Sequence, residues 1–223
     1  MNLRYTLKIS ACALGLCWSL LSVSATAEVL LDPMQMQNWE VHEFVEGTRY
    51  IARQEDQQSM LMANTKHGAG GYGLERSLNI RKTPWLVWRW KADKFPQVDD
   101  ERVKAGDDFV ARVYVIKKGL FGIFGTKVIN YVFSAKQPTG SQWINPFTSR
   151  AVMIAASGND SPKGEWIEVR RNLMQDWQKV WGEQPKSLDA IAIMTDADNS
   201  KSAARAVYGP IMLTSQVANG VQK

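Results

Sequence analysis

Residues 84–115, PWLVWRWKADKFPQVDDERVKAGDDFVARVYV, contain two apolar, aromatic-rich runs joined by an acidic segment. In the first run Leu86, Trp88 and Trp90 occupy alternate positions, as in a strand with one buried face. Pro96 and Gly106 interrupt the acidic segment, which we interpret as a solvent-exposed connection. The second run places on one face the residues Phe109, Ala111, Val113 and Val115. The stretch therefore predicts two core strands of an all-β domain.

The N-terminus has the pattern of a secretory signal peptide. Arg4 and Lys8 precede an uncharged, mostly apolar run over residues 9–23, and Ala25-Thr26-Ala27 follows it. The run is shorter than the roughly 20 residues that a membrane-spanning helix needs. We therefore expect cleavage after Ala27, leaving residues 28–223 as a single β-sandwich domain.

Cysteine content and charge limit the class of protein. Cys12 and Cys17 both lie in the predicted signal peptide, so the exported chain would have neither disulfides nor thiolate chemistry. The net charge of +5 falls to +3 when Arg4 and Lys8 are removed. No dense run of Lys and Arg appears, and we expect no nucleic-acid partner. These features predict a periplasmic or secreted bacterial protein.

Residues 68–73, GAGGYG, match the glycine spacing of a dinucleotide-binding turn. That fingerprint requires a helix to begin at the last glycine, whereas Leu74, Arg76 and Leu78 alternate as in a strand. We therefore interpret the glycines as a flexible surface loop that leads into a strand.

A single helix is predicted over residues 172–181, followed by Gly182 at a C-terminal stop position. Its apolar face is formed by Leu173, Trp177, Val180 and Trp181. The rest of the chain consists of about ten strand-length segments without βαβ alternation. This organisation predicts an antiparallel β-sandwich of jelly-roll type with one short helix.

Several short motifs occur along the chain: WRWK at 88–91, KFP at 94–96, AGDDF at 105–109, RVYV at 112–115, INYV at 129–132, NPF at 145–147 and MTDADN at 194–199. Together they resemble a bacterial family of exported proteins, the domain of unknown function numbered 3047. The resemblance extends from Trp39 to Leu213 and implies an exported single domain, a jelly roll similar to carbohydrate-binding modules. It implies no established activity.

Polar and aromatic residues on the predicted strands suggest a ligand site. Aromatic rings stack on sugars, planar polar side chains bind hydroxyl groups, and arginine binds carboxylates of acidic glycans. We therefore predict a non-catalytic protein that binds a carbohydrate or envelope polysaccharide; the alternative is an ordinary solvated sheet face. One face is expected to carry Arg89, Arg112, Tyr114 and Asn130, with Glu168 and Arg170 beside them and Trp143 on a neighbouring loop.

A calcium site is a further candidate. Asp196, Asp198 and Asn199 offer three oxygen ligands at close spacing, which suits a hard cation. The segment lacks the turn glycine and terminal glutamate of a helix-loop-helix calcium loop, so the alternative is a polar turn capped by its own side chains. No other cofactor is expected, and His42 and His67 stand too far apart in sequence to suggest a zinc site.

Two other functions stay open. A carboxylate-dependent glycan-cleaving enzyme would need a pair among Asp107, Asp108, Glu165, Glu168, Asp196 and Asp198, and no pair is favoured. A membrane or envelope interaction protein would use the apolar tip at 117–127, where lysines surround Leu120, Phe121, Ile123 and Phe124. In the alternative interpretation, this tip folds back over one edge of the sandwich.

Overall fold

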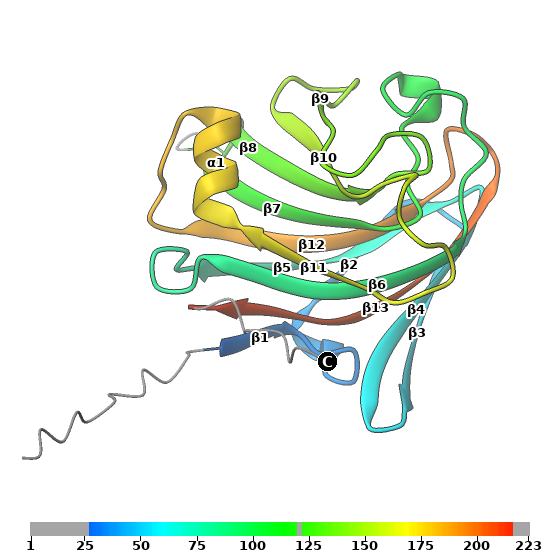
Figure 1. The fold of residues 1–223 in the computed structure, drawn as a ribbon, viewed down its shortest axis with the longest axis horizontal. Helices are drawn as coiled ribbons and strands as arrows, with labels where there is room; N and C mark the ends of the chain where they lie inside the picture. Colours follow the sequence, from blue (N-terminus) through cyan, green and yellow to red (C-terminus); the bar gives the residue numbers. More distant parts are fainter. Residues whose placement is uncertain (1–26, 120–121, 216–223) are drawn as a thin grey trace, which may run out of the picture.

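In the described part of the chain, two β-sheets pack face to face, with one short α-helix at one end of the sandwich (Figure 1). The computed structural model describes residues 27–119 and 122–215, with side chains for all of them except 122–124. The predicted all-β sandwich with one short helix is confirmed.

The first sheet has the strand order β11-β6-β13-β4-β3, with β1 pairing with β13 beyond the end of β4. Its described pairs are all antiparallel. Its strands are β1 (Ala27–Leu31), β3 (Thr48–Glu55), β4 (Gln58–Lys66), β6 (Trp85–Lys94), β11 (Ile167–Asn172) and β13 (Ala203–Thr214).

The second sheet has the order β2-β5-β12-β7-β8-β10-β9. The predicted hairpin of β7 and β8 is present, with Lys117 opposite Lys127. The pair β8 and β10 is parallel, because residues 134–150 carry the chain back before β10 begins beside Val128. The strands are β2 (Glu40–Val45), β5 (Ala69–Leu78), β7 (Arg112–Gly119), β8 (Gly122–Phe133), β9 (Gln142–Ile144), β10 (Ala151–Ser157) and β12 (Leu188–Asp196).

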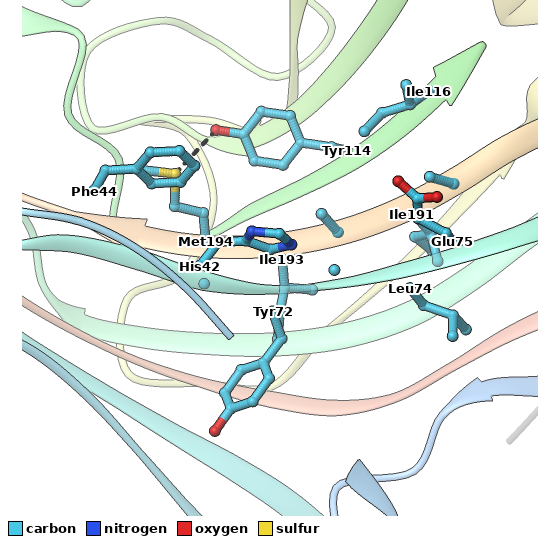
Figure 2. A pocket seen from close by; sticks show the side chains of 14 residues that line it. His42, Phe44, Tyr72, Leu74, Glu75, Tyr114, Ile116, Ile191, Ile193 and Met194 are labelled. Atoms are coloured by element: carbon cyan, nitrogen blue, oxygen red, sulfur yellow. Dashed lines mark hydrogen bonds between the residues drawn. The ribbon is translucent and has the colours of Figure 1, made fainter. Parts of the chain in front are cut away.

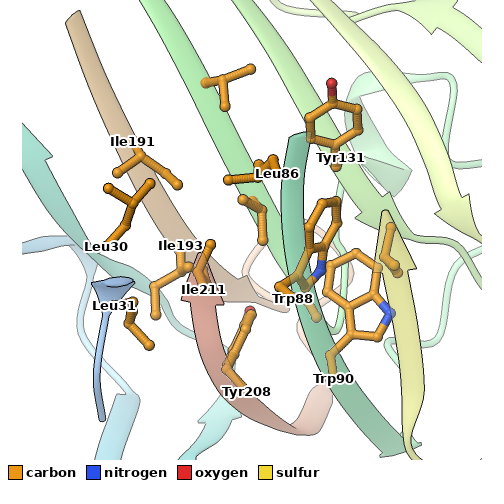
Figure 3. Packing of buried hydrophobic residues seen from close by; sticks show 14 of the residues in the cluster. Leu30, Leu31, Leu86, Trp88, Trp90, Tyr131, Ile191, Ile193, Tyr208 and Ile211 are labelled. Carbon is orange, nitrogen blue, oxygen red and sulfur yellow. The ribbon is translucent and has the colours of Figure 1, made fainter. Parts of the chain in front are cut away.

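Aromatic side chains fill the space between the sheets (Figure 3). Trp88 and Trp90 are buried and meet edge to face, with ring centroids 5.3 Å apart. Trp90 also stacks on Phe133, and its indole N–H donates to the Ser157 hydroxyl over 2.9 Å. The alternation in the sequence thus identified the inner face of β6 correctly.

The predicted helix is α1 (Leu173–Trp181), which closes one end of the sandwich. The Asn172 side chain accepts the N–H of Gln175 over 3.1 Å, and Gly182 ends the helix at a φ of 69°. Leu173 and Trp177 are buried, as their spacing predicted. Within the described ranges, no helix has both the length and the apolar character needed to cross a bilayer.

The acidic connection after β6 is not a solvated loop, which corrects our prediction. Glu101, Asp107 and Asp108 are all buried, and Phe109 at the end of the segment packs on Val132 and Met153 of the second sheet. Glu101 accepts bonds from the Ser134 hydroxyl and, over 2.7 Å, from the backbone N–H of Ala135. This carboxylate therefore ties the connection to the turn after β8. Two 3-10 turns complete the fold, η1 (Met36–Asn38) and η2 (Lys104–Gly106).

Two predictions concern parts of the chain that lie outside the described residues. Residues 1–26 are among them, so the signal peptide stays a prediction; Ala27 is the first residue of β1. Leu120 and Phe121 also lie outside, and the side chains of Ile123 and Phe124 are not described. Membrane contact through this tip therefore stays a prediction.

Candidate functional site

The residues predicted to form one ligand site lie on two different sheets. Arg89 is on β6 of the first sheet, where Glu168 and Arg170 are its neighbours on β11. Tyr114 and Asn130 face each other on β7 and β8 of the second sheet. The expectation that all of them share one face is therefore wrong, because two aromatic strands adjacent in sequence entered opposite layers.

Arg112 is buried and ion-paired, which corrects its placement on an open face. Its side chain is 4% exposed, and its Nε and Nη2 both donate to the carboxylate of Asp196, with 2.8 Å from Nε to Oδ1. Nη2 also donates to the backbone carbonyl of Asp107 over 2.5 Å. The ring of Phe109 lies 4.5 Å from the guanidinium carbon. The arginine thus has a structural role at this position.

Asn130 and Trp143 belong to the same covered region. Phe109, Val132 and Met153 form a second, smaller hydrophobic cluster outside the sandwich, and Trp143 packs against it. Asn130 is buried, and its amide approaches the Met153 sulfur at 3.5 Å. We call this region the covered end; its members are Asp108, Phe109, Arg112, Asn130, Trp143, Met153 and Asp196.

Tyr114 instead borders an open groove on the outer face of the same sheet (Figure 2). The groove has a volume of about 350 Å³ and runs over β2, β5, β12 and β7. Small residues form its floor, because the outward positions of β5 and β12 are occupied by Gly71, Gly73, Ala190 and Ala192. Larger side chains project from the sheet only at the edges of the groove.

The glycines of β5 correct the prediction of a flexible loop. Gly70, Gly71 and Gly73 lie inside the strand. A Cβ at Gly73 would come within 2.8 Å of the imidazole of His42, and one at Gly71 within 2.0 Å of the Ile193 carbonyl oxygen. Glycine in a strand is typical where another group approaches the backbone closely. These residues leave the groove floor at the level of the backbone.

Aromatic side chains border the groove on both sides. His42 and Phe44 stand on the edge strand β2, with Phe44 69% exposed. On the opposite side, the Tyr114 hydroxyl donates to the Met194 sulfur over 3.3 Å. Among the described residues, Glu75 is the one carboxylate that lines the groove, and it pairs with Lys118 over 2.6 Å. The groove can thus hold a flat, largely apolar surface and offer polar groups at its edges.

The predicted calcium ligands are only partly brought together. Carboxylate oxygens of Asp108, Asp196 and Asp198 lie within 4.8 Å of one another. Asn199 uses its amide N–H to donate to Asp108 and to the Asp107 carbonyl, and Arg112 occupies both oxygens of Asp196. This arrangement suits the alternative of a turn capped by its own side chains. Calcium binding stays a prediction.

Burial governs the protonation of these acids. It raises the pKa of Asp196 to about 7, although the charge of Arg112 acts in the opposite direction. Burial likewise raises the pKa of Asp198, and repulsion by Asp108 adds to the shift. Burial lowers the pKa of Arg112, but Asp196 and other negative groups more than offset this effect, so Arg112 stays charged. Burial therefore favours the protonated forms of Asp196 and Asp198, while Arg112 stays a cation.

Comparison with known proteins identifies the family. The sequence model of a family described as "Protein of unknown function (DUF3047)" matches residues 37–212. The chain belongs to the DUF3047 family. No curated protein matches its sequence.

Solved structures similar to this DUF3047 protein include sugar-binding domains. The family 11 carbohydrate-binding module from Clostridium thermocellum, in complex with a β-1,3-1,4-mixed-linked tetrasaccharide, is 12% identical; the match covers 84% of this chain and 94% of the module, with a TM-score of 0.44. A mutant of the module CBM29-2 complexed with cellulohexaose is 11% identical, with coverages of 86% and 93% and a TM-score of 0.40. The potassium-bound carbohydrate recognition domain of Emp46p is 12% identical, with coverages of 82% and 91% and a TM-score of 0.41. Similarities at this level transfer neither a ligand nor a site.

Sequence reasoning missed most of the groove in this DUF3047 protein. Of its lining, only Tyr114 was predicted as a site residue. The glycines on alternate positions of residues 69–75 were a usable signal, since a strand without side chains on one face leaves a channel there. The pairing of β5 with β12, which supplies the alanines, has no local signal in the sequence.

Proposed function

We propose that this protein binds a carbohydrate chain in the groove on the outer face of the second sheet. The observation that carries the proposal is the floor of glycine and alanine between Phe44 on one side and Tyr114 on the other. A pyranose ring has apolar C–H faces and polar edges. One face can lie on the backbone of β5 and β12 while the two aromatic side chains contact the sugar from either side.

The groove also provides polar groups where sugar hydroxyls would lie. The imidazole of His42, the Tyr114 hydroxyl and the Glu75 carboxylate can each form hydrogen bonds. These groups are few, and most of the lining is apolar. Contact with aromatic and aliphatic side chains would therefore supply most of the affinity, and hydrogen bonds would fix the orientation.

Binding without cleavage agrees best with the groove. Glycoside hydrolysis ordinarily uses two carboxylic groups, about 5 to 9.5 Å apart, on either side of the bond that breaks. The groove is lined by one, Glu75, whose partner is Lys118. Asp108 and Asp196 of the covered end are buried on the same face, and Asp196 is paired with Arg112. We propose a non-catalytic role on this ground.

The natural ligand would be a polysaccharide outside the cytoplasm. This part of the proposal rests on the predicted signal peptide and cleavage after Ala27. An exported binding domain would encounter envelope or extracellular glycans.

A glycan array tests the proposal, using protein purified after expression of the full chain. We expect binding to one class of oligosaccharide, and a loss of about tenfold or more in affinity for Phe44→Ala. Val41→Ala is the matched control: Val41 is 68% exposed on the same strand but faces away from the groove. Absence of binding to any glycan, or equal loss in both variants, would contradict the proposal.

A further inference from the structure

A second hollow lies on the opposite side of the molecule, on the outer face of the first sheet. It has a volume of about 370 Å³ and lies between the turn that joins β3 to β4 and the strands β6, β11 and β13. Val87, Pro210 and Met212 give it apolar walls. Gln58, Ser59, Arg89 and Glu168 add polar groups, and the Glu168 carboxylate is paired with Arg170. Its residues share none with the groove.

Arg89 is held in a defined position above this sheet. Its aliphatic part lies over Gly209 of β13, where an added Cβ would come within 2.7 Å of the Arg89 Cγ. Its Nη2 donates to the side-chain oxygen of Gln58, and its guanidinium carbon lies 4.7 Å from the centre of the Trp166 ring. Contacts from several strands therefore fix the orientation of this guanidinium.

The charge of Arg89 is not neutralised within the described residues. Glu168 is its direct partner in the register of β6 and β11, yet the Glu168 carboxylate pairs with Arg170, with 2.6 Å to Nε. Lys91 adds a second cation, 5.6 Å from the Trp166 ring. A fixed guanidinium with donors not used by any carboxylate favours a planar oxyanion as ligand.

The rim of the hollow contains an unusual turn. Asp56 and Gln57 join β3 to β4 with φ angles of 47° and 63°. Turns with two positive φ angles ordinarily use Asn-Gly, and strained backbone of this kind is enriched at functional sites. The turn places Gln58 beside Arg89, so the uncommon backbone serves the geometry of the hollow.

We propose that this hollow binds a carboxylated sugar residue of an acidic polysaccharide. Its carboxylate would bind Arg89 through the guanidinium donors that face the hollow, and its hydroxyls would bond to Gln58 and Ser59. The C–H groups of the ring would contact Val87, Pro210 and Met212. This site does not depend on the groove, because the two occupy opposite sheets.

Calorimetric titration at low salt with trigalacturonate provides the test, using protein from the full chain. We expect the methyl-esterified trisaccharide, which lacks the charge, to bind about tenfold more weakly or worse. Free acetate tests the carboxylate alone and should bind far more weakly than the trisaccharide. Arg89→Lys keeps the positive charge but loses the planar guanidinium that can bind a carboxylate through two N–H groups, so the affinity for trigalacturonate should fall about tenfold.

Gln58→Glu is the sharpest variant, since it places a carboxylate of nearly the same shape against Arg89. The variant should fold normally but not bind trigalacturonate, because the new carboxylate would form an ion pair with Arg89 and occupy its donors. Arg205→Met, which removes an exposed cation paired with Asp93 on the same sheet, is the control and should bind normally. Phe44→Ala should also bind normally, which separates this site from the groove.

Several results would overturn the proposal. One is no binding of trigalacturonate by the unaltered protein; others are equal affinity for the acid and its methyl ester, and unchanged affinity in folded Gln58→Glu. Acetate binding as tight as that of the trisaccharide would also overturn it, by showing a site for small anions. Thermal unfolding of each variant checks folding, and if Arg89→Lys does not fold, Gln58→Glu decides.

Discussion

Two ends of the same sheet face differ in what covers them. Arg112 and Tyr114 are two positions apart on β7 and point to the same side, as Asp196 and Met194 do on β12. At one end, Phe109 and Trp143 lie over the sheet, and Arg112 and Asp196 are buried as an ion pair. At the other end nothing described covers the strands, and the groove remains open.

The difference shows that a strand's outward face is defined by what packs on it from elsewhere. The covered end needs bulky and charged residues, because the side chains must fill space and satisfy one another away from water. The open end needs small residues, because any larger side chain would fill the groove. One face therefore contributes to stability at one end and, as we propose, to binding at the other.

The largest effect is expected from breaking the ion pair of the covered end. Arg112→Met removes the cation from Asp196 and Asp107 and leaves their carboxylates buried without it. We expect a loss of about 3–5 kcal/mol in the free energy of unfolding, measured by urea denaturation. Binding in the groove should persist in whatever fraction stays folded.

Arg205→Met is the matched control for this loss. Its ion pair with Asp93 is on the surface, where such pairs contribute about 0–1 kcal/mol. An Arg112→Met protein as stable as this control would show that the covered end is not the closed unit we describe.

Removing the Trp143 side chain from the second hydrophobic cluster should lower the free energy of unfolding by a smaller amount. Trp143 is partly buried over Phe109, with ring centroids 6.2 Å apart. Trp143→Ala should destabilise the protein by about 2 kcal/mol, less than a fully buried tryptophan. Hydrogen exchange should show faster exchange of the Phe109 backbone N–H, which donates to Asp196. If the Phe109 N–H exchanges at an unchanged rate, Trp143 does not shield this end of the sheet from water.

Buried strand residues and the helix could be predicted from the sequence, because both depend on local periodicity. Trp88 and Trp90 were assigned to the core because residues on one face of a strand recur every second position. The helix over residues 173–181 followed in the same way from a spacing of three to four residues and from Gly182. Both patterns are complete within a few residues of chain.

The candidate site could not be predicted to the same degree, because contacts between distant segments decide it. Arg112 alternates like an exposed residue, and only the return of residues 107–109 and 143 over β7 buries it. Trp143 was predicted to lie in a polar loop but belongs to the short strand β9, and a tryptophan in so polar a stretch was the available hint that the stretch packs on another part of the protein. The alanines of the groove floor become a site only through the pairing of β12 with β5 and β7.

The covered end should also give stability a dependence on pH. The pKa of Asp196 is raised to about 7 and that of its neighbour Asp198 is also raised, so the folded state holds protons more tightly than the unfolded chain. This contribution is complete below about pH 4 and is lost as pH rises through 7. We therefore expect the free energy of unfolding to fall by about 1 kcal/mol or more between pH 5 and pH 8.

Thermal unfolding at the two pH values measures this change, which corresponds to about 2–4 °C. Asp198→Asn removes a carboxylate that repels Asp108, so the free energy of unfolding should change less between pH 5 and pH 8. Hydrogen bonds lower the pKa values of Asp93, Asp100 and Asp160, so these acids do not contribute to the change between pH 5 and pH 8. Calcium, if it binds the cluster, should raise the unfolding temperature more at pH 8 than at pH 5. A rise in stability from pH 5 to pH 8 would contradict this account.

The smallest effect on stability is expected at the open end. Ala192 lies between Gly73 and Tyr114 in the register of the sheet, at the centre of the groove floor. Ala192→Leu adds a side chain where the groove has room for it, so stability should change by no more than about 0.5 kcal/mol. The same side chain would occupy the space proposed for the sugar ring, so affinity should fall about tenfold or more. Ala203→Leu adds equal volume on the outer face of the first sheet, away from the groove, and should leave binding intact. If Ala192→Leu destabilised the protein as strongly as Trp143→Ala, the groove would belong to the packed structure, and the contrast between the two ends would fail.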